Sequence, residues 1–207
     1  TPNKIRTQLE NWLESTEMYS SKLKTYERCV TINYADYGSL GFSIDVVPSA
    51  LATDDTKTQM MSEGCLPEYV NTAIEVAEVN EDKPDRWISS NPQAYVKWFR
   101  DINEPFASEY RTERKRKIFE SNKNIYNSEE DVPEYFNKSS LQMAIQLLKR
   151  ARDVHFSKLG REKEKLKPIS AIISTIVLDT AKRGLIPYSA DVIEVIRIVL
   201  NELKTYS

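Results

Sequence analysis

The segment GFSIDVVP, residues 41–48, places one carboxylate in the middle of an apolar strand. Apolar side chains recur at every second position and share one face, as a β-strand requires: Phe42, Ile44 and Val46. Asp45 lies on the opposite face. A carboxylate among apolar neighbours needs water, a cation or a metal ion close by. Asp45 is therefore either an exposed acid on a solvated strand face or a metal ligand.

The composition narrows the class of protein. The chain has 207 residues, enough for one domain or two small lobes, and its 40% hydrophobic and 29% charged content is typical of a soluble globular protein. A net charge of -2 gives no overall attraction to nucleic acid, which is not an expected partner. Two cysteines and one histidine argue against a zinc site or a disulfide framework and favour a reducing cytoplasm. No apolar run approaches the roughly 20 residues of a membrane span.

The first half of the chain mixes helical and strand patterns. Apolar residues at helical spacing predict a helix over residues 2–14. Period-two patterns predict three strands, over residues 28–34, 42–47 and 73–79. The first two strands are expected to pair antiparallel, and Glu75 in the third is expected to face solvent. Residues 49–68, which include Asp54, are predicted to form a loop.

The second half of the chain is predicted to be helical apart from a polar loop over residues 121–137. Its helices begin at residue 92 and then span residues 141–156, 171–181 and 192–203. The basic run at 111–117 is interleaved with acids, which favours a solvated helix face over a nucleic-acid contact. Lys149 borders the apolar stripe of its helix, and Ser170 lies at the start of the next helix, where free backbone N–H groups favour an anion.

These elements predict an α+β fold with a partial sheet lobe over residues 1–105 and a helical lobe over residues 106–207. Four motifs stand in order along the chain: IDVVP at 44–48, WISSNPxxYxxWF at 87–99, LQxAIQLLKRxRDVxF at 141–156 and KPISxIIxT at 167–175. This order resembles the later part of bacterial CD-NTases, the cyclic-oligonucleotide synthases of anti-phage defence. They are related to cyclic GMP-AMP synthase and oligoadenylate synthetase. The resemblance covers roughly residues 26–180.

The resemblance implies a nucleotidyltransferase with a mixed sheet bearing catalytic carboxylates and a helical lobe closing over nucleotides. The expected substrates are nucleoside triphosphates, ATP and/or GTP among them, joined into a cyclic di- or trinucleotide. In the family, three carboxylates hold two Mg²⁺ ions, and the third of these matches Asp45, which gives Asp45 a catalytic and metal-binding role. The family residues that contact the donor triphosphate match Lys149 and Ser170.

One family feature is missing from the sequence. The Gly-Ser motif followed by an Asp-x-Asp strand should precede the helix at residues 2–14, and it is absent. The chain is therefore expected to be an internal portion of the enzyme, inactive without its N-terminal catalytic segment. Two alternatives stay open: a linear oligoadenylate or tRNA-type nucleotidyltransferase, and a non-catalytic module that binds nucleotides.

Overall fold

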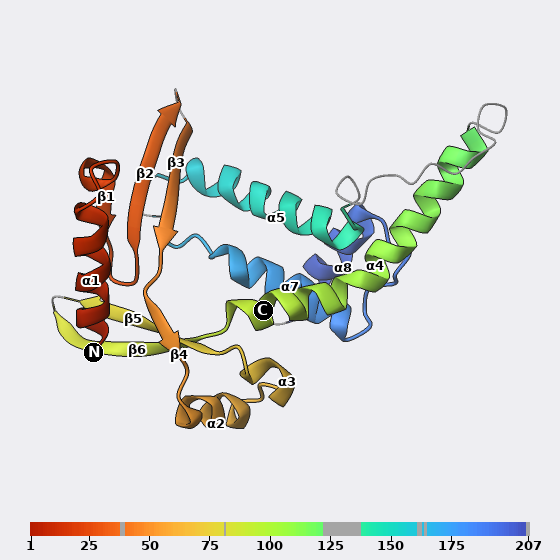
Figure 1. The fold of residues 1–207 in the computed structure, drawn as a ribbon. Coiled ribbons are helices and arrows are strands. Elements are labelled where there is room, and N and C mark those ends of the chain that lie inside the picture. The colour runs from red at the N-terminus through yellow and green to blue at the C-terminus, as the bar shows by residue number, and fades with distance from the viewer. Residues whose placement is uncertain (38–39, 81, 122–137, 161–162, 164, 206–207) are drawn as a thin grey trace. The chain divides into compact units, whose positions relative to one another are not determined.

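The computed structural model describes residues 1–37, 40–80, 82–121, 138–160, 163 and 165–205. Its contacts divide the chain into two compact units, Thr1–Val96 and Lys97–Ser207 (Figure 1). The division falls inside one long helix, α4 (Pro92–Ser121). The predicted lobe boundary after residue 105 lies farther along the same helix and stays a prediction.

The first unit begins with the predicted helix and strand pair. Helix α1 (Pro2–Glu14) starts at Thr1, whose hydroxyl accepts a hydrogen bond from the backbone N–H of Lys4. A short 3-10 turn, η1 (Ser20–Lys22), leads into a three-stranded sheet of β1 (Leu23–Thr25), β2 (Val30–Tyr37) and β3 (Leu40–Val46). The antiparallel pairing of β2 with β3 confirms the predicted pair. Val30 and Ile32 are buried with Leu13 of α1 and form a small core.

A second sheet of three strands completes this unit. After Val47 and Pro48 the chain continues from β3 into β4, as Figure 1 shows. The strand order is β4 (Ser49–Leu51), β5 (Ile74–Asn80) and β6 (Lys83–Ser90). The backbone N–H of Ala77 donates to the carbonyl of Pro48 at 3.1 Å, and that of Val79 donates to the carbonyl of Glu27 at 2.9 Å. These two bonds join the second sheet to the segments that flank the first.

The sheets differ from the predicted mixed sheet. Every strand pair in the described residues is antiparallel, although the combination of helices and small sheets is compatible with the α+β class. The short connections from β2 to β3 and from β5 to β6 reverse the chain, whereas a parallel pair needs a crossover of a dozen or more residues.

The predicted loop over residues 49–68 is also wrong. The segment contains β4 and two helices, α2 (Asp54–Ser62) and α3 (Pro67–Val70). The hydroxyl of Thr53 accepts from the backbone N–H of Thr56 at 3.3 Å, so the polar run is the capped start of a helix. Pro67 occupies the first position of α3, where a proline favours a helix rather than breaking it.

The second unit is helical in its described part and confirms the predicted helices. They are α4, α5 (Ser140–Ser157), α7 (Ser170–Lys182) and α8 (Val192–Lys204). Ser139 begins α5 with a reciprocal pair of hydrogen bonds to Gln142, a capping box. Apolar side chains from all four helices form one buried core, including Phe106, Leu141, Val177, Val195 and Val199.

The basic run at residues 111–117 lies on α4. Its described side chains include two that pair with acids, as predicted for a solvated helix face. Arg111 pairs with Glu104 at 2.6 Å, and Lys117 pairs with Glu113 at 2.8 Å. The predicted loop over residues 121–137 lies outside the described residues beyond Ser121. Within the described ranges, no helix combines the length and the apolar character needed to cross a membrane.

Candidate functional site

Asp45 lies on the polar face of the β2–β3 pair. It stands directly opposite Thr31, whose hydroxyl donates to Asp45 Oδ1 at 2.6 Å. Thr31 is buried, whereas Asp45 is exposed. Because side chains alternate along a strand, this face is the one opposite the core formed by Val30 and Ile32. One oxygen of the Asp45 carboxylate is therefore hydrogen-bonded to the sheet, and the charged group is exposed to solvent.

The described residues around Asp45 do not complete a magnesium site. Mg²⁺ prefers an octahedron of oxygen ligands, and a two-ion site needs several carboxylates close together. No group of three or more acidic, histidine or cysteine side chains is suitably arranged to hold a metal within the described part of the chain. Asp45 could supply one ligand there, and the metal stays a prediction.

The predicted phosphate-binding residues lie on α5 and α7 of the second unit. Lys149 is half-buried on α5, with no hydrogen bond or ion pair to another described residue. Ser170 is exposed and is the first residue of α7, which confirms its predicted place at a helix start. The structure describes Asp45 in the first unit and these two residues in the second.

The start of α7 is suited to an anion. Its N-cap residue is Ile169, which has no side chain able to accept from the first backbone N–H groups. The backbone N–H of Ile172 bonds to the carbonyl of Ile169 at 3.1 Å, as in a tight first turn. The partial positive charge of a helix start favours a negatively charged group, and here no acidic side chain lies in the first turn.

Arg152 joins α5 to the start of α7, a role that is not among those predicted from the sequence. Its Nη1 donates to the carbonyl of Pro168 at 2.7 Å and lies 3.2 Å from Ser170 Oγ. Its Nε and Nη2 donate to Asp153 Oδ1 at 3.0 and 2.8 Å. The spacing of three residues from Lys149 puts Arg152 on the same helix face, and this is the signal that could have identified it.

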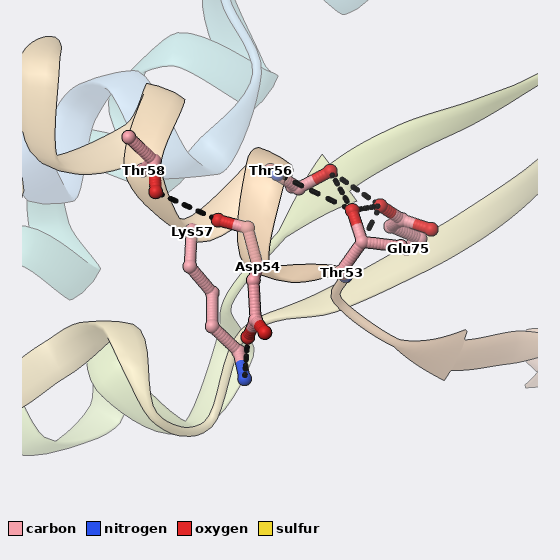
Figure 2. A network of polar contacts seen from close by, with 6 residues as sticks. All are labelled: Thr53, Asp54, Thr56, Lys57, Thr58 and Glu75. Carbon is pink, nitrogen blue, oxygen red and sulfur yellow. Dashed lines mark hydrogen bonds and ion pairs between the residues drawn. The ribbon is translucent and has the colours of Figure 1, made fainter.

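Glu75 is buried, so the prediction that it faces solvent is wrong. Figure 2 shows its carboxylate at the start of α2, where it accepts from the hydroxyls of Thr53 and Thr56. The backbone N–H of Thr53 also donates to it, at 3.4 Å. The hydrogen bond from Thr56 holds the pKa of Glu75 below its ordinary value, aided by Thr53 and opposed by burial. The network fastens α2 to β5.

A second acid on β5, Glu78, is also buried and engaged. Arg86 Nε bonds its Oε2 at 2.5 Å, and Arg28 Nε bonds its Oε1 at 2.7 Å. These hydrogen bonds, that of Arg86 first, hold the pKa of Glu78 below its ordinary value. Both faces of β5 are covered, since Glu75 through Val79 are all buried. The two β5 acids therefore belong to the internal structure of the sheet.

Fold and site together define an α+β protein with an exposed strand carboxylate and a helix start suited to an anion. No family model matches the chain. A c-di-GMP synthase of Roseivirga ehrenbergii is 27% identical to it over 175 residues. The aligned region covers 84% of this chain, which spans about 37% of the length of that curated relative. The chain is thus distantly similar to a cyclic-dinucleotide synthase.

Proposed function

We propose that this chain is part of a nucleotidyltransferase that joins nucleoside triphosphates, ATP and/or GTP among them, into a cyclic di- or trinucleotide. The observation behind the proposal is the similarity to the c-di-GMP synthase over most of the chain. The start of α7 supports it independently, because a triphosphate is the anionic part that all the expected substrates share.

In this proposal the α5–α7 region binds the triphosphate. Lys149 contributes a point charge on a flexible stem, which can follow a phosphate through the reaction. Ser170 contributes a hydroxyl and a backbone N–H at the positive end of α7. The absence of an ion pair between Lys149 and other described residues leaves its charge available to a ligand.

The proposal gives Asp45 the role of one metal ligand on the sheet. Its carboxylate is exposed, and in the described part of the chain Thr31 is the one side chain that donates to it. Mg²⁺, if bound with further carboxylates, would neutralise charge on the phosphates. No group of three or more candidate metal ligands is found among the described residues, so further ligands would have to come from elsewhere in the complete site.

The experiment is a product assay with the protein expressed from its complete reading frame. It is incubated with labelled ATP, GTP, CTP and UTP and Mg²⁺, and the products are treated with phosphatase. A phosphatase-resistant product that disappears with Asp45→Ala is the expected result. Asp55→Ala, which removes an exposed acid at the start of α2, is the matched control and should keep the activity. Unchanged yield with Asp45→Ala would contradict the role of Asp45.

One observation favours a second candidate, a module that binds nucleotides without catalysis. Among the described residues, no group of three or more acidic, histidine or cysteine side chains is arranged to hold a metal ion. Binding of ATP or GTP without Mg²⁺-dependent turnover would support this candidate. The same assay tests the linear nucleotidyltransferase. A linear product keeps a 5′ triphosphate, and phosphatase removes these terminal phosphates.

The anti-phage role is a separate proposal. It predicts that cells expressing the complete gene resist phage infection and that Asp45→Ala abolishes the resistance. Equal plating of phage on cells with and without the gene would contradict it.

A further inference from the structure

Arg152 forms a rigid bridge between two helices at the proposed triphosphate site. Only 12% of its side chain is exposed, and its guanidinium contacts three groups: Asp153, Pro168 and Ser170. On one side, Nε and Nη2 both point to Asp153 Oδ1. On the other side, Nη1 points to the carbonyl of Pro168 and to the hydroxyl of Ser170. The guanidinium is thus fixed from both sides.

The contact with Arg152 leaves the proton of the Ser170 hydroxyl free to be donated. A guanidinium has five donors and no acceptor, so Ser170 Oγ must be the acceptor in its contact with Arg152. A hydroxyl that accepts still has one O–H to donate. No acceptor for that proton is present among the described residues, and Ser170 is exposed. Its proton is therefore available to water or to a bound ligand.

The bond to Pro168 fixes the backbone that bears Ser170. The carbonyl of Pro168 lies two residues before the helix start, in a segment whose N-cap, Ile169, makes no side-chain hydrogen bond. Arg152 thus restrains from α5 the backbone just before the helix, while the first backbone N–H groups of α7 keep no side-chain acceptor. A lysine could not replace it, because one ammonium lacks the planar fork that reaches Asp153 and Pro168 in opposite directions.

We infer that Arg152 is a positioning residue for Ser170, which it holds with the hydroxyl proton aimed at a phosphate oxygen of the bound nucleoside triphosphate. The inference rests on the proposed function, which places the triphosphate at the start of α7. Asp153 takes part by neutralising and orienting the guanidinium, so Arg152 itself need not touch the phosphates.

The test is a double-mutant cycle on ligand binding. Wild type, Arg152→Lys, Ser170→Ala and the double variant are titrated calorimetrically with the α,β-methylene analogue of GTP and Mg²⁺, in the protein made from its complete reading frame. Each single variant should weaken binding about tenfold, the loss expected for one hydrogen bond to a charged group. The double variant should also be about tenfold weaker, since both changes remove the same bond.

Two controls separate positioning from folding and from general charge. Arg150→Lys changes an exposed arginine on α5 that has no ion pair to a described residue, and it should bind as the wild type does. Guanosine, which has no phosphates, should bind equally to all variants. If Arg152→Lys lowers the melting temperature, Arg152→Gln, which can still donate one hydrogen bond, replaces it in the cycle.

Two results would overturn the inference. One is a double variant about a hundredfold weaker than the wild type, because independent effects multiply. The other is unaltered binding of the triphosphate by Ser170→Ala. Neither result depends on turnover, so failure of the inference is distinguishable from failure of the proposed synthase activity, which the product assay measures.

Discussion

Asp45 and Glu75 are both acids on strands of the first unit, yet their surroundings differ. Asp45 is exposed and accepts one hydrogen bond, from Thr31 on the neighbouring strand. Glu75 is 8% exposed and accepts from two hydroxyls and a backbone N–H at the start of α2 (Figure 2). All three bonds go to one oxygen, Oε1. A buried carboxylate with several donors contributes to stability, whereas an exposed carboxylate with one donor is available to a ligand.

The largest expected effect separates function from stability at Asp45. Asp45→Asn keeps the shape of the side chain and its acceptor for Thr31, but it removes the negative charge. We expect synthesis of the product to fall by more than about a hundredfold, since a metal ligand would be lost. The free energy of unfolding should change by less than about 0.5 kcal/mol, as for an exposed site.

The measurements are product yield with Mg²⁺ and chemical denaturation of the same samples. Asp55→Asn, on an exposed acid in the first turn of α2, is the matched control and should leave both unchanged. A large loss of stability with Asp45→Asn would show that Asp45, like Glu75, belongs to the internal structure.

The opposite pattern is expected at Glu75. Glu75→Ala removes the acceptor of the Thr56 hydroxyl and of the Thr53 backbone N–H and one acceptor of the Thr53 hydroxyl, and so detaches α2 from β5. We expect the free energy of unfolding to fall by about 2 kcal/mol, since several hydrogen bonds to one charged carboxylate are lost together. Urea denaturation measures it, with Glu68→Ala, an exposed acid on α3, as control. Equal midpoints for the two variants would show that the network contributes nothing.

The contrast between these acids also shows what the sequence could predict. The pairing of β2 with β3 and the face of Asp45 followed from period-two alternation, and the start of α7 followed from Lys167, Pro168 and Ser170. These features are local, and local patterns report them. The burial of Glu75 was not predictable in this way, because alternation indicates a solvated face only when one side of the sheet is exposed.

Contacts between distant segments account for the remaining differences. Glu75 accepts from Thr53 and Thr56, which lie about twenty residues earlier at the start of α2, in a segment whose sequence predicts a loop. Glu78 is satisfied by Arg28, fifty positions away. Arg152 was identifiable as a neighbour of Lys149 on α5, but its bond to Pro168 depends on how α5 packs with α7. Such pairings require the tertiary structure.

A smaller effect is expected from the single donor to Asp45. Thr31→Val keeps the volume of a buried side chain and removes the hydroxyl that bonds Asp45 Oδ1. Stability should fall by about 1 kcal/mol or less, because exposed Asp45 can bond to water instead. Product yield should fall by more than the small loss of stability explains, since the carboxylate of Asp45 loses its fixed orientation. Thermal melts measure the change in stability, and the product assay measures the change in yield. Thr58→Val, which changes an exposed threonine on α2, is the control.

That variant also separates two hypotheses for Asp45. If its orientation matters for a ligand, Thr31→Ser, which restores the hydroxyl, should recover most of the activity. Equal activities of the valine and serine variants would show that the hydroxyl of Thr31 has no part in positioning Asp45.

The smallest expected effect is the pH dependence of stability at Glu75. Its pKa in the folded protein is lowered from 4.5, chiefly by the hydrogen bond from Thr56. A carboxylate with a lowered folded pKa stabilises the folded state fully above its unfolded pKa and loses that contribution as pH falls through the folded value. The stability advantage of the wild type over Glu75→Gln should therefore be constant near pH 7 and shrink below about pH 4.5.

Urea denaturation of both proteins between about pH 7 and pH 3 measures this difference, with Glu68→Gln as the exposed control. A difference at Glu75 that stayed constant down to pH 3 would place its stabilising role in the shape of the side chain instead of its charge.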